Sequence, residues 1–160
     1  MRNSYSFELE LDLKATQTVR INAQELEQVL VNLLVNAIHA IENKKGEICV
    51  AARDWDDKGV VILIKDNGYG MDSEKISRVF NPFYSTKQQG EGTGLGLSLS
   101  YGLIRRYGGN ITVKSNPGAG AEFYVWLLSQ PVLVGDEETI AEQLHEYEAV
   151  ATRVKFGERV

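Results

Sequence analysis

The chain has 160 residues, of which 43% are hydrophobic and 24% charged, and its formal net charge is −5. These proportions suit one compact globular domain and exclude a disordered tail. The negative charge gives no general surface for nucleic acid, so we expect none as a partner. Cys49 is the single cysteine, which favours a reducing, cytoplasmic compartment. No apolar run reaches the roughly 20 residues of a membrane span, although a longer parent protein could still be membrane-anchored.

The first part of the chain carries strand signals on either side of one long helix. Apolar residues alternate with polar ones from Phe7 to Leu11, which predicts a strand, and residues 18–21 are expected as a second extended piece. Asn22 is a favourable helix N-cap, and apolar residues then recur at helical spacing from Leu26 to Ile41. Two strands joined by a tight turn are expected next, at residues 47–54 and 60–66.

The second part of the chain alternates glycine-rich loops with regular elements. A short helix is expected from Asp72 through about Phe80, followed by a polar loop at residues 81–93. A further helix at 95–107 ends at glycines, and a hairpin closes the pattern with strands at 111–116 and 121–128. This order favours an α+β fold, a two-layer sandwich whose mixed, mainly antiparallel sheet is covered on one face by three helices.

A row of polar residues runs along the long predicted helix. Asn32 and Asn36 lie one turn apart, on the face opposite the apolar stripe, and His39 extends the row. Asparagines on a helix are most often part of a solvated face. The functional alternative is that their amide oxygens bind a hard cation, because Mg²⁺ takes oxygen ligands and few of them from the protein. The row alone leaves both interpretations open.

Two glycine-rich segments are further candidates for a binding site. Residues 66–71, DNGYGM, come directly after an apolar strand and form either a simple turn or a site where a carboxylate meets a base amino group. Residues 90–97, GEGTGLGL, open a predicted helix and place four glycines in seven positions. Backbone N–H groups freed from side chains at a helix start can bind phosphate. No Gly-Lys-Ser/Thr follows, which excludes the P-loop pattern.

In this order and spacing, the segments resemble the histidine-kinase branch of the Bergerat ATP-binding superfamily. The matching runs are QVLVNLLVNAIHAI, DNGYGM, FNPFYSTK and GEGTGLGLSLSYGLIRRYGGNI, which together cover roughly residues 5–128. The resemblance implies the Bergerat fold, with ATP and Mg²⁺ as ligands. It also implies a kinase that passes the γ-phosphate to a histidine on a separate dimerisation domain.

The resemblance also implies a role for individual residues. Asn36 is expected to bind Mg²⁺, and Asn32 to lie beside the phosphates as a catalytic residue. Asp66 is expected to accept a hydrogen bond from the adenine amino group, in a pocket shaped by Gly68 and Gly70. The phosphates are expected to meet the mobile ammonium of Lys87, which is also assigned as catalytic, together with His39, Gly92, Thr93, Gly94, Leu95, Gly96 and Leu97.

Asn32 separates this branch from the gyrase-like ATPases, which are expected to carry a glutamate there that activates water. An amide offers no such base, which disfavours a serine kinase of the anti-sigma-factor type. A nucleotide-sensing module without transfer chemistry is the other alternative. The expected partners are the dimerisation and phosphoacceptor domain of a homodimeric parent and a response regulator. Ala121 departs from the threonine common in the family, so a hydroxyl near the adenine is expected to be missing.

We expect the ATP-binding domain to occupy residues 1–129. Residues 130–160 are expected to be a linker or capping helix, since Ile140, Leu144 and Tyr147 lie at helical spacing. The alternative is the start of a truncated receiver-like segment, because three acidic residues from Asp136 follow an apolar run.

Overall fold

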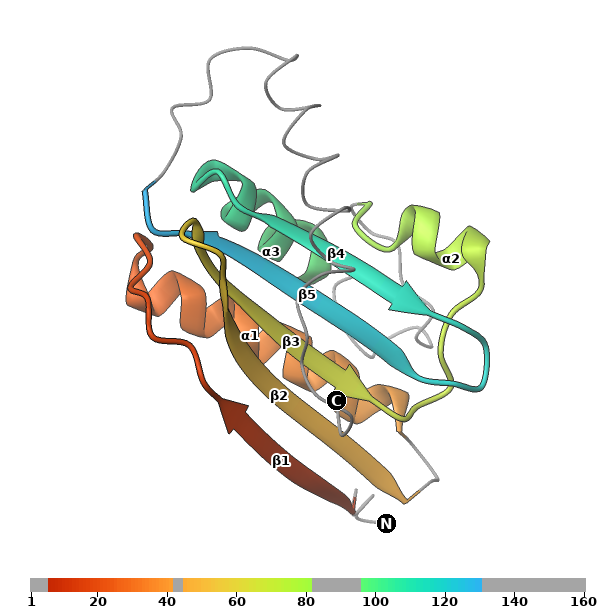
Figure 1. The fold of residues 1–160 in the computed structure, drawn as a ribbon. Helices are drawn as coiled ribbons and strands as arrows, with labels where there is room; N and C mark the ends of the chain where they lie inside the picture. Colours follow the sequence, from red (N-terminus) through yellow and green to blue (C-terminus); the bar gives the residue numbers. More distant parts are fainter. Residues whose placement is uncertain (1–5, 42–44, 82–95, 131–160) are drawn as a thin grey trace.

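A computed structural model describes residues 6–41, 45–81 and 96–130 of the chain (Figure 1). Its framework is one five-stranded sheet with the order β1-β2-β3-β5-β4. β1 pairs with β2 in parallel, and every other neighbouring pair is antiparallel. The strands are β1 (Phe7–Leu13), β2 (Gly46–Trp55), β3 (Gly59–Asp66), β4 (Asn110–Ser115) and β5 (Ala121–Leu128).

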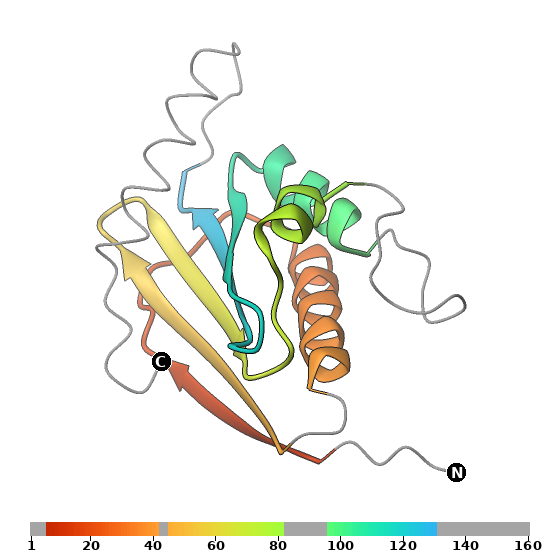
Figure 2. The same cartoon turned by 90° about the vertical axis from the view of Figure 1, so that its right-hand side faces the viewer.

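Three helices lie on one face of this sheet, as Figure 2 shows from the side. They are α1 (Ala23–Ala40), α2 (Ser73–Arg78) and α3 (Gly96–Arg106). The predicted two-layer α+β sandwich, with its mixed sheet and one-sided helical layer, is therefore confirmed. The described helices include none that is both long enough and apolar enough to cross a bilayer.

The predicted extended piece at residues 18–21 is not a strand. This segment crosses the end of the sheet and joins it through one backbone bond, from Arg20 N to Leu128 O at 3.1 Å. Val19 and Ile21 are instead packed against the core beneath the helices. The apolar alternation thus comes from two side chains that point into the core from a connecting segment. The backbone of this segment does not pair with a strand along its length.

The helical layer is anchored by α1. Asn22 caps this helix, its side-chain oxygen accepting hydrogen bonds from the backbone N–H groups of Gln24 and Glu25 at 2.9 and 3.1 Å. The apolar stripe of α1 buries Val29 and Leu33 to 0% and 1% exposure against the sheet. On the flank of α1 that faces α3, the hydroxyl of Tyr107 donates to the carboxylate of Glu25 and ties the end of α3 to the start of α1.

The sheet separates two apolar clusters, because successive residues of a strand point to opposite faces. The inner cluster lies under the helices and includes Ile64, Phe123 and Val125. The second cluster, here named the outer-face cluster, lies on the other side of the same strands. Its members are Cys49, Ala51, Trp55, Val61, Leu63, Tyr124 and Trp126.

Edge strand β1 differs from the rest of the sheet. Its register places Leu9 and Leu11 beside Ile48 and Val50 of β2, on the side of the helices. The helical layer does not extend over β1, and its apolar side chains remain between 38% and 63% exposed. β1 is held to β2 through its backbone and through an ion pair between Asp12 and Arg53, which holds the pKa of that carboxyl below its usual range.

Candidate functional site

The candidate site begins at the end of β3, where Asp66 is 3% exposed. One oxygen of its carboxylate, Oδ1, accepts a hydrogen bond from the backbone N–H of Gly68 at 2.8 Å. Across the sheet, Asp66 is in register with Ala121, the first residue of β5. A carboxylate with a fixed orientation is thus held at the end of a central strand.

The loop after Asp66 is attached to elements on both sides of it. Asn67 joins it to the start of β2, since its side chain accepts from Glu47 N at 2.8 Å and donates to Lys45 O at 3.0 Å. Tyr69 N donates to Ala40 O at the end of α1 at 3.0 Å, and Tyr69 O accepts from Gly118 N at 2.7 Å. The loop therefore connects the end of α1 with the turn between β4 and β5.

Glycine is required in this loop by close backbone packing. A Cβ added at Gly68 would lie 2.3 Å from the carbonyl oxygen of Ala40. Gly70 has a φ of +70°, and a Cβ there would lie 2.0 Å from the carbonyl oxygen of Asn116. Both glycines therefore let the loop approach α1 and the β4–β5 turn, and in this way they determine the shape of the surface beside Asp66.

The asparagine row lies on the flank of α1 that faces α3, and its predicted position opposite the apolar stripe is wrong. Asn32 is half-buried, and its amide nitrogen donates to Ser100 Oγ at 3.2 Å and to Gly96 O at 3.5 Å. Asn36 and His39 are also half-buried and lie one and two turns further along the same flank. The apolar stripe of α1 is wide, so the polar row borders it where α3 packs alongside.

The start of α3 is the third part of the site. A Cβ at Gly96 would lie 3.9 Å from Asn32 Cγ, which is ordinary van der Waals distance. Packing against the described residues therefore does not require glycine at this position, in contrast to Gly68 and Gly70. The first N–H groups of a helix attract anions. Leu97 is half-buried and packs against the inner cluster, so its side chain belongs to the core.

Five of the residues expected at the phosphates lie outside the described residues. They are Lys87, Gly92, Thr93, Gly94 and Leu95.

Asn36 fits the proposed contact with Mg²⁺ in its chemistry. Its amide oxygen is a hard donor on the same flank of α1 as Asn32, one turn beyond the point where Asn32 contacts the start of α3. In the parts of the chain that the structure covers, no three His, Cys, Asp or Glu side chains gather as a metal-binding group. A magnesium ion here would therefore take one ligand from Asn36 and others from phosphate and water, which is usual for nucleotide-bound Mg²⁺.

Three supporting residues were missed by the sequence reasoning. Ser115 Oγ accepts from Met71 N at 2.8 Å and donates to Gly120 O at 2.6 Å, which fastens the loop to β4 and β5. Gly120, with a φ of +75°, allows the close approach of that turn to Asp66. Ser100 holds Asn32. The sequence indicated only Gly120, as part of the PGAG turn at residues 117–120. The contacts of Ser115 and Ser100 depend on which elements become neighbours in the fold.

Comparison with known proteins agrees with this geometry. The sequence profile of the histidine kinase-, DNA gyrase B- and HSP90-like ATPases matches residues 21–131. The chain belongs to this ATPase family. Residues 21–131 contain Asn32, Asn36, Asp66 and the start of α3, so the whole candidate site lies within the match.

Several of the similar proteins are histidine kinases. Sensor histidine kinase ZraS of Salmonella typhimurium is 39% identical over 140 residues, which are 86% of this chain and 29% of that protein. The catalytic domain of histidine kinase ThkA superposes with a TM-score of 0.68 at 28% identity, over 78% of this chain and 82% of that one. Full-length ShkA in complex with AMPPNP gives a TM-score of 0.64 at 26% identity, over 79% of this chain and 27% of that one. The chain thus spans less than a third of ZraS.

Replacement of Gly68 by alanine tests the close packing of the loop after Asp66. The added Cβ would collide with the Ala40 carbonyl, and we expect a loss of about 1–3 kcal/mol in the free energy of unfolding, as for other overpacked positions. Gly102→Ala is the matched control, since a Cβ at this helical position meets nothing within 4 Å. It should raise stability by up to about 1 kcal/mol. Urea unfolding measures both, and equal effects of the two variants would contradict the packing.

Proposed function

We propose that the chain binds Mg-ATP and is the ATP-binding catalytic domain of a sensor histidine kinase. The supporting observation is that one flank of α1 reaches from the Asp66 loop, at Ala40, to the start of α3, at Asn32. These two points are separated by about 12 Å along the helix, from eight residues of 1.5 Å rise each. This distance lets a base bind at the Asp66 end while its phosphates reach the α3 end.

At the base end, Asp66 supplies specificity for adenine. Its buried carboxylate accepts hydrogen bonds but cannot donate them when ionised, so it favours a base that presents an amino group. The backbone N–H of Gly68 holds one carboxylate oxygen, which fixes the plane of the group before a ligand arrives. Gly68 and Gly70 shape the neighbouring pocket wall.

At the phosphate end, Asn36 would hold Mg²⁺, while Asn32, His39 and Gly96 would lie beside the phosphates. The metal would neutralise charge on the phosphates during transfer. The N–H groups at the start of α3 would also stabilise the negative charge of the phosphates. The run Gly92, Thr93, Gly94, Leu95 and Leu97 would complete the phosphate cradle, and Lys87 would reach the terminal phosphate.

Asn32 favours phosphoryl transfer over hydrolysis. Its amide is hydrogen-bonded to Ser100 and Gly96 on α3 and carries no basic group that could activate water. Phosphoryl transfer needs mainly positioning and neutralisation of charge, so a site without a base remains competent when an acceptor is brought in line. The amide thus helps to keep ATP intact until the acceptor arrives.

The acceptor we propose is a histidine on a dimerisation segment of the parent protein. His39 and His145 are the only histidines of this chain. His39 lies on the proposed phosphate side, and neither belongs to a helical segment that precedes the ATP-binding domain. The parent would be a homodimer in the cytoplasm or at a membrane, and it would pass its phosphoryl group to a response regulator.

A phosphotransfer assay tests this function. The chain with Mg²⁺ and γ-labelled ATP should take up negligible label alone. It should place acid-labile phosphate on the parent's histidine-bearing segment when that segment is added, because only then is an acceptor in line. Lys87→Ala should reduce this transfer, and Gly102→Ala is the control that leaves it unchanged. Efficient acid-labile labelling of the chain itself would contradict the proposal.

Ala121 gives a gain-of-affinity prediction. It lies opposite Asp66 in the sheet register and is 6% exposed. A threonine would bring a hydroxyl beside the proposed adenine site, and one added hydrogen bond contributes about 0.5–1.5 kcal/mol. We therefore expect Ala121→Thr to tighten ATP binding by roughly 2- to 10-fold in calorimetry. Ala121→Val is the control of similar shape, and an equal gain with valine would show that the hydroxyl is not responsible.

A further inference from the structure

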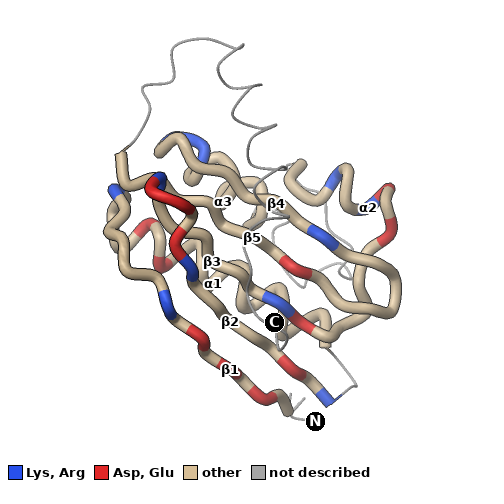
Figure 3. Tube along the Cα trace, in the orientation of Figure 1, with Lys and Arg blue, Asp and Glu red and all other residues tan. Residues whose placement is uncertain are grey.

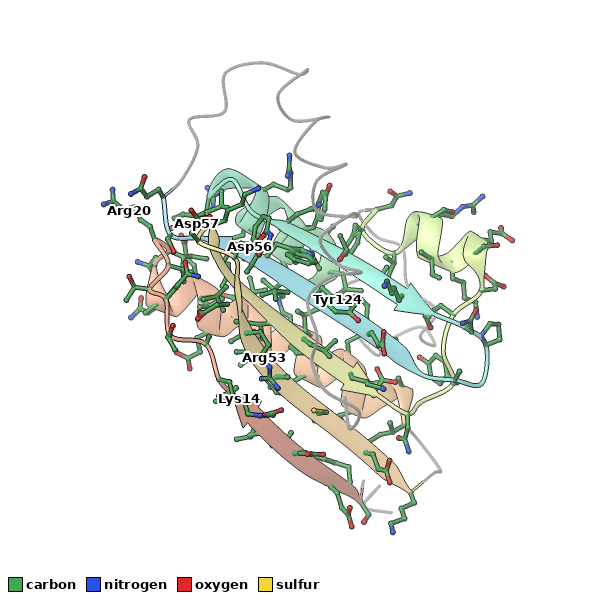
Figure 4. The ribbon with its side chains drawn as sticks, viewed as in Figure 1. Lys14, Arg20, Arg53, Asp56, Asp57 and Tyr124 are labelled. Carbon is green, nitrogen blue, oxygen red and sulfur yellow. The ribbon has the colours of Figure 1, made fainter. Side chains whose placement is uncertain are left out.

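The outer face of the sheet is apolar at its centre. The outer-face cluster joins residues of β2, β3 and β5, and Figure 1 looks onto this face, with the helices behind the sheet. Charged residues lie toward the ends of β3 and β5 and leave the middle of both strands uncharged (Figure 3). Tyr124 and Arg53 project from this face in Figure 4.

The cluster is as well buried as the inner core. Val61 and Trp126 are 0% exposed, Leu63 is 1%, Trp55 is 2% and Tyr124 is 7%. The rings of Trp55 and Trp126 meet edge to face with centroids 5.2 Å apart, and those of Tyr124 and Trp126 stack at 6.2 Å. These contacts join the three rings to one another within the sheet face. Burial also raises the pKa of the Cys49 thiol and of the Tyr124 phenol.

Strand β1 provides an internal comparison for this burial. Its Leu9, Leu11 and Leu13 project on the helical side of the sheet, beyond the edge of the helical layer, and they keep 52%, 60% and 63% exposure. The larger side chains of the outer-face cluster would expose comparable fractions if nothing lay above them. A further part of the protein must therefore cover the cluster.

We look for this cover within the same chain, because the low exposed fractions are those of a single chain. All three described helices lie on the opposite face (Figure 2). Of the remaining segments, residues 1–5 and 42–44 are short, and 82–95 lies in the sequence between α2 and α3, two helices of the opposite face. Residues 131–160 begin three positions after the last residue of β5, which contributes Tyr124 and Trp126 to the cluster. This segment is thus both long enough and attached at the right place.

We propose that residues 131–160 dock on the outer-face cluster through an amphipathic helix. Its apolar stripe would carry Ile140, Leu144 and Tyr147, which follow an i, i+4, i+7 spacing. The opposite side of that helix is acidic, and no Lys or Arg occurs from Asp136 to Glu148. At the border of the cluster, Lys58 and Lys114 lie over the rings of Trp55 and Tyr124, within reach of such acidic residues.

The chain carries its own reporters for this contact. Its only two tryptophans, Trp55 and Trp126, and its only cysteine, Cys49, are all members of the outer-face cluster. Tryptophan emission and the rate of Cys49 modification by a thiol reagent therefore measure the cover on this face without added labels. Nucleotide binding occurs on the opposite side of the sheet, so it provides an independent check that the domain remains folded.

Two single substitutions in the full chain separate docking from general effects. Leu144→Gln removes an apolar side chain from the stripe, whereas Glu142→Gln makes a change on the opposite side of the same helix. We expect Leu144→Gln to shift tryptophan emission to longer wavelength and to accelerate Cys49 modification about tenfold, as local opening becomes easier. Glu142→Gln should change neither, and both variants should keep their far-ultraviolet circular dichroism. Unchanged emission and labelling in Leu144→Gln would overturn the proposal.

A truncated chain ending at Gln130 identifies the covering segment directly. The truncation should show the same red shift and fast Cys49 labelling, and a peptide of residues 131–160 added in trans should reverse both. Reporters that remain protected in the truncated chain would overturn the proposal. So would protection that depends on protein concentration in the full chain, because a second copy would then provide the cover.

Discussion

The hydrogen bond between the buried carboxylate of Asp66 and the N–H of Gly68 is the contact on which the site depends. It fixes an acidic group at the end of a central strand, and it requires a loop that passes within van der Waals contact of α1 and of the β4–β5 turn. Glycines at 68, 70 and 120 make those approaches possible. The same loop then ties the end of α1 to the sheet, so the polar flank of α1 is placed relative to Asp66 by backbone packing.

The sequence was most informative where a residue's role is local. The cap at Asn22, the turn between β2 and β3 and the hairpin of β4 and β5 follow from short-range backbone preferences, and these elements were predicted correctly. The strand expected at 18–21 was wrong, because inward-facing Val19 and Ile21 produce the same alternation in a connection. Asn32 was placed on the wrong side of α1, since its contact with Ser100 depends on the packing of α3.

The two faces of the sheet pack against different parts of the protein. The inner face holds the helices and, through α1, the candidate nucleotide site of this member of the histidine kinase-, DNA gyrase B- and HSP90-like ATPase family. The outer face carries an aromatic cluster of equal burial, whereas edge strand β1 keeps its apolar side chains exposed. A sheet with two buried faces needs cover on both, and the sequence pattern of β3 and β5, apolar at nearly every position, is consistent with this requirement.

Calorimetric titration of Asp66→Asn with Mg-ATP tests the central claim most directly. The substitution keeps the shape of the side chain but removes the charge and replaces one acceptor oxygen by a donor. A lost hydrogen bond to a charged group amounts to about 1.5–3 kcal/mol, so affinity should fall by roughly 10- to 150-fold. Asp72→Asn makes the same chemical change at the cap of α2 and should leave affinity as it is. Equal affinity of Asp66→Asn and the unaltered chain would contradict the account.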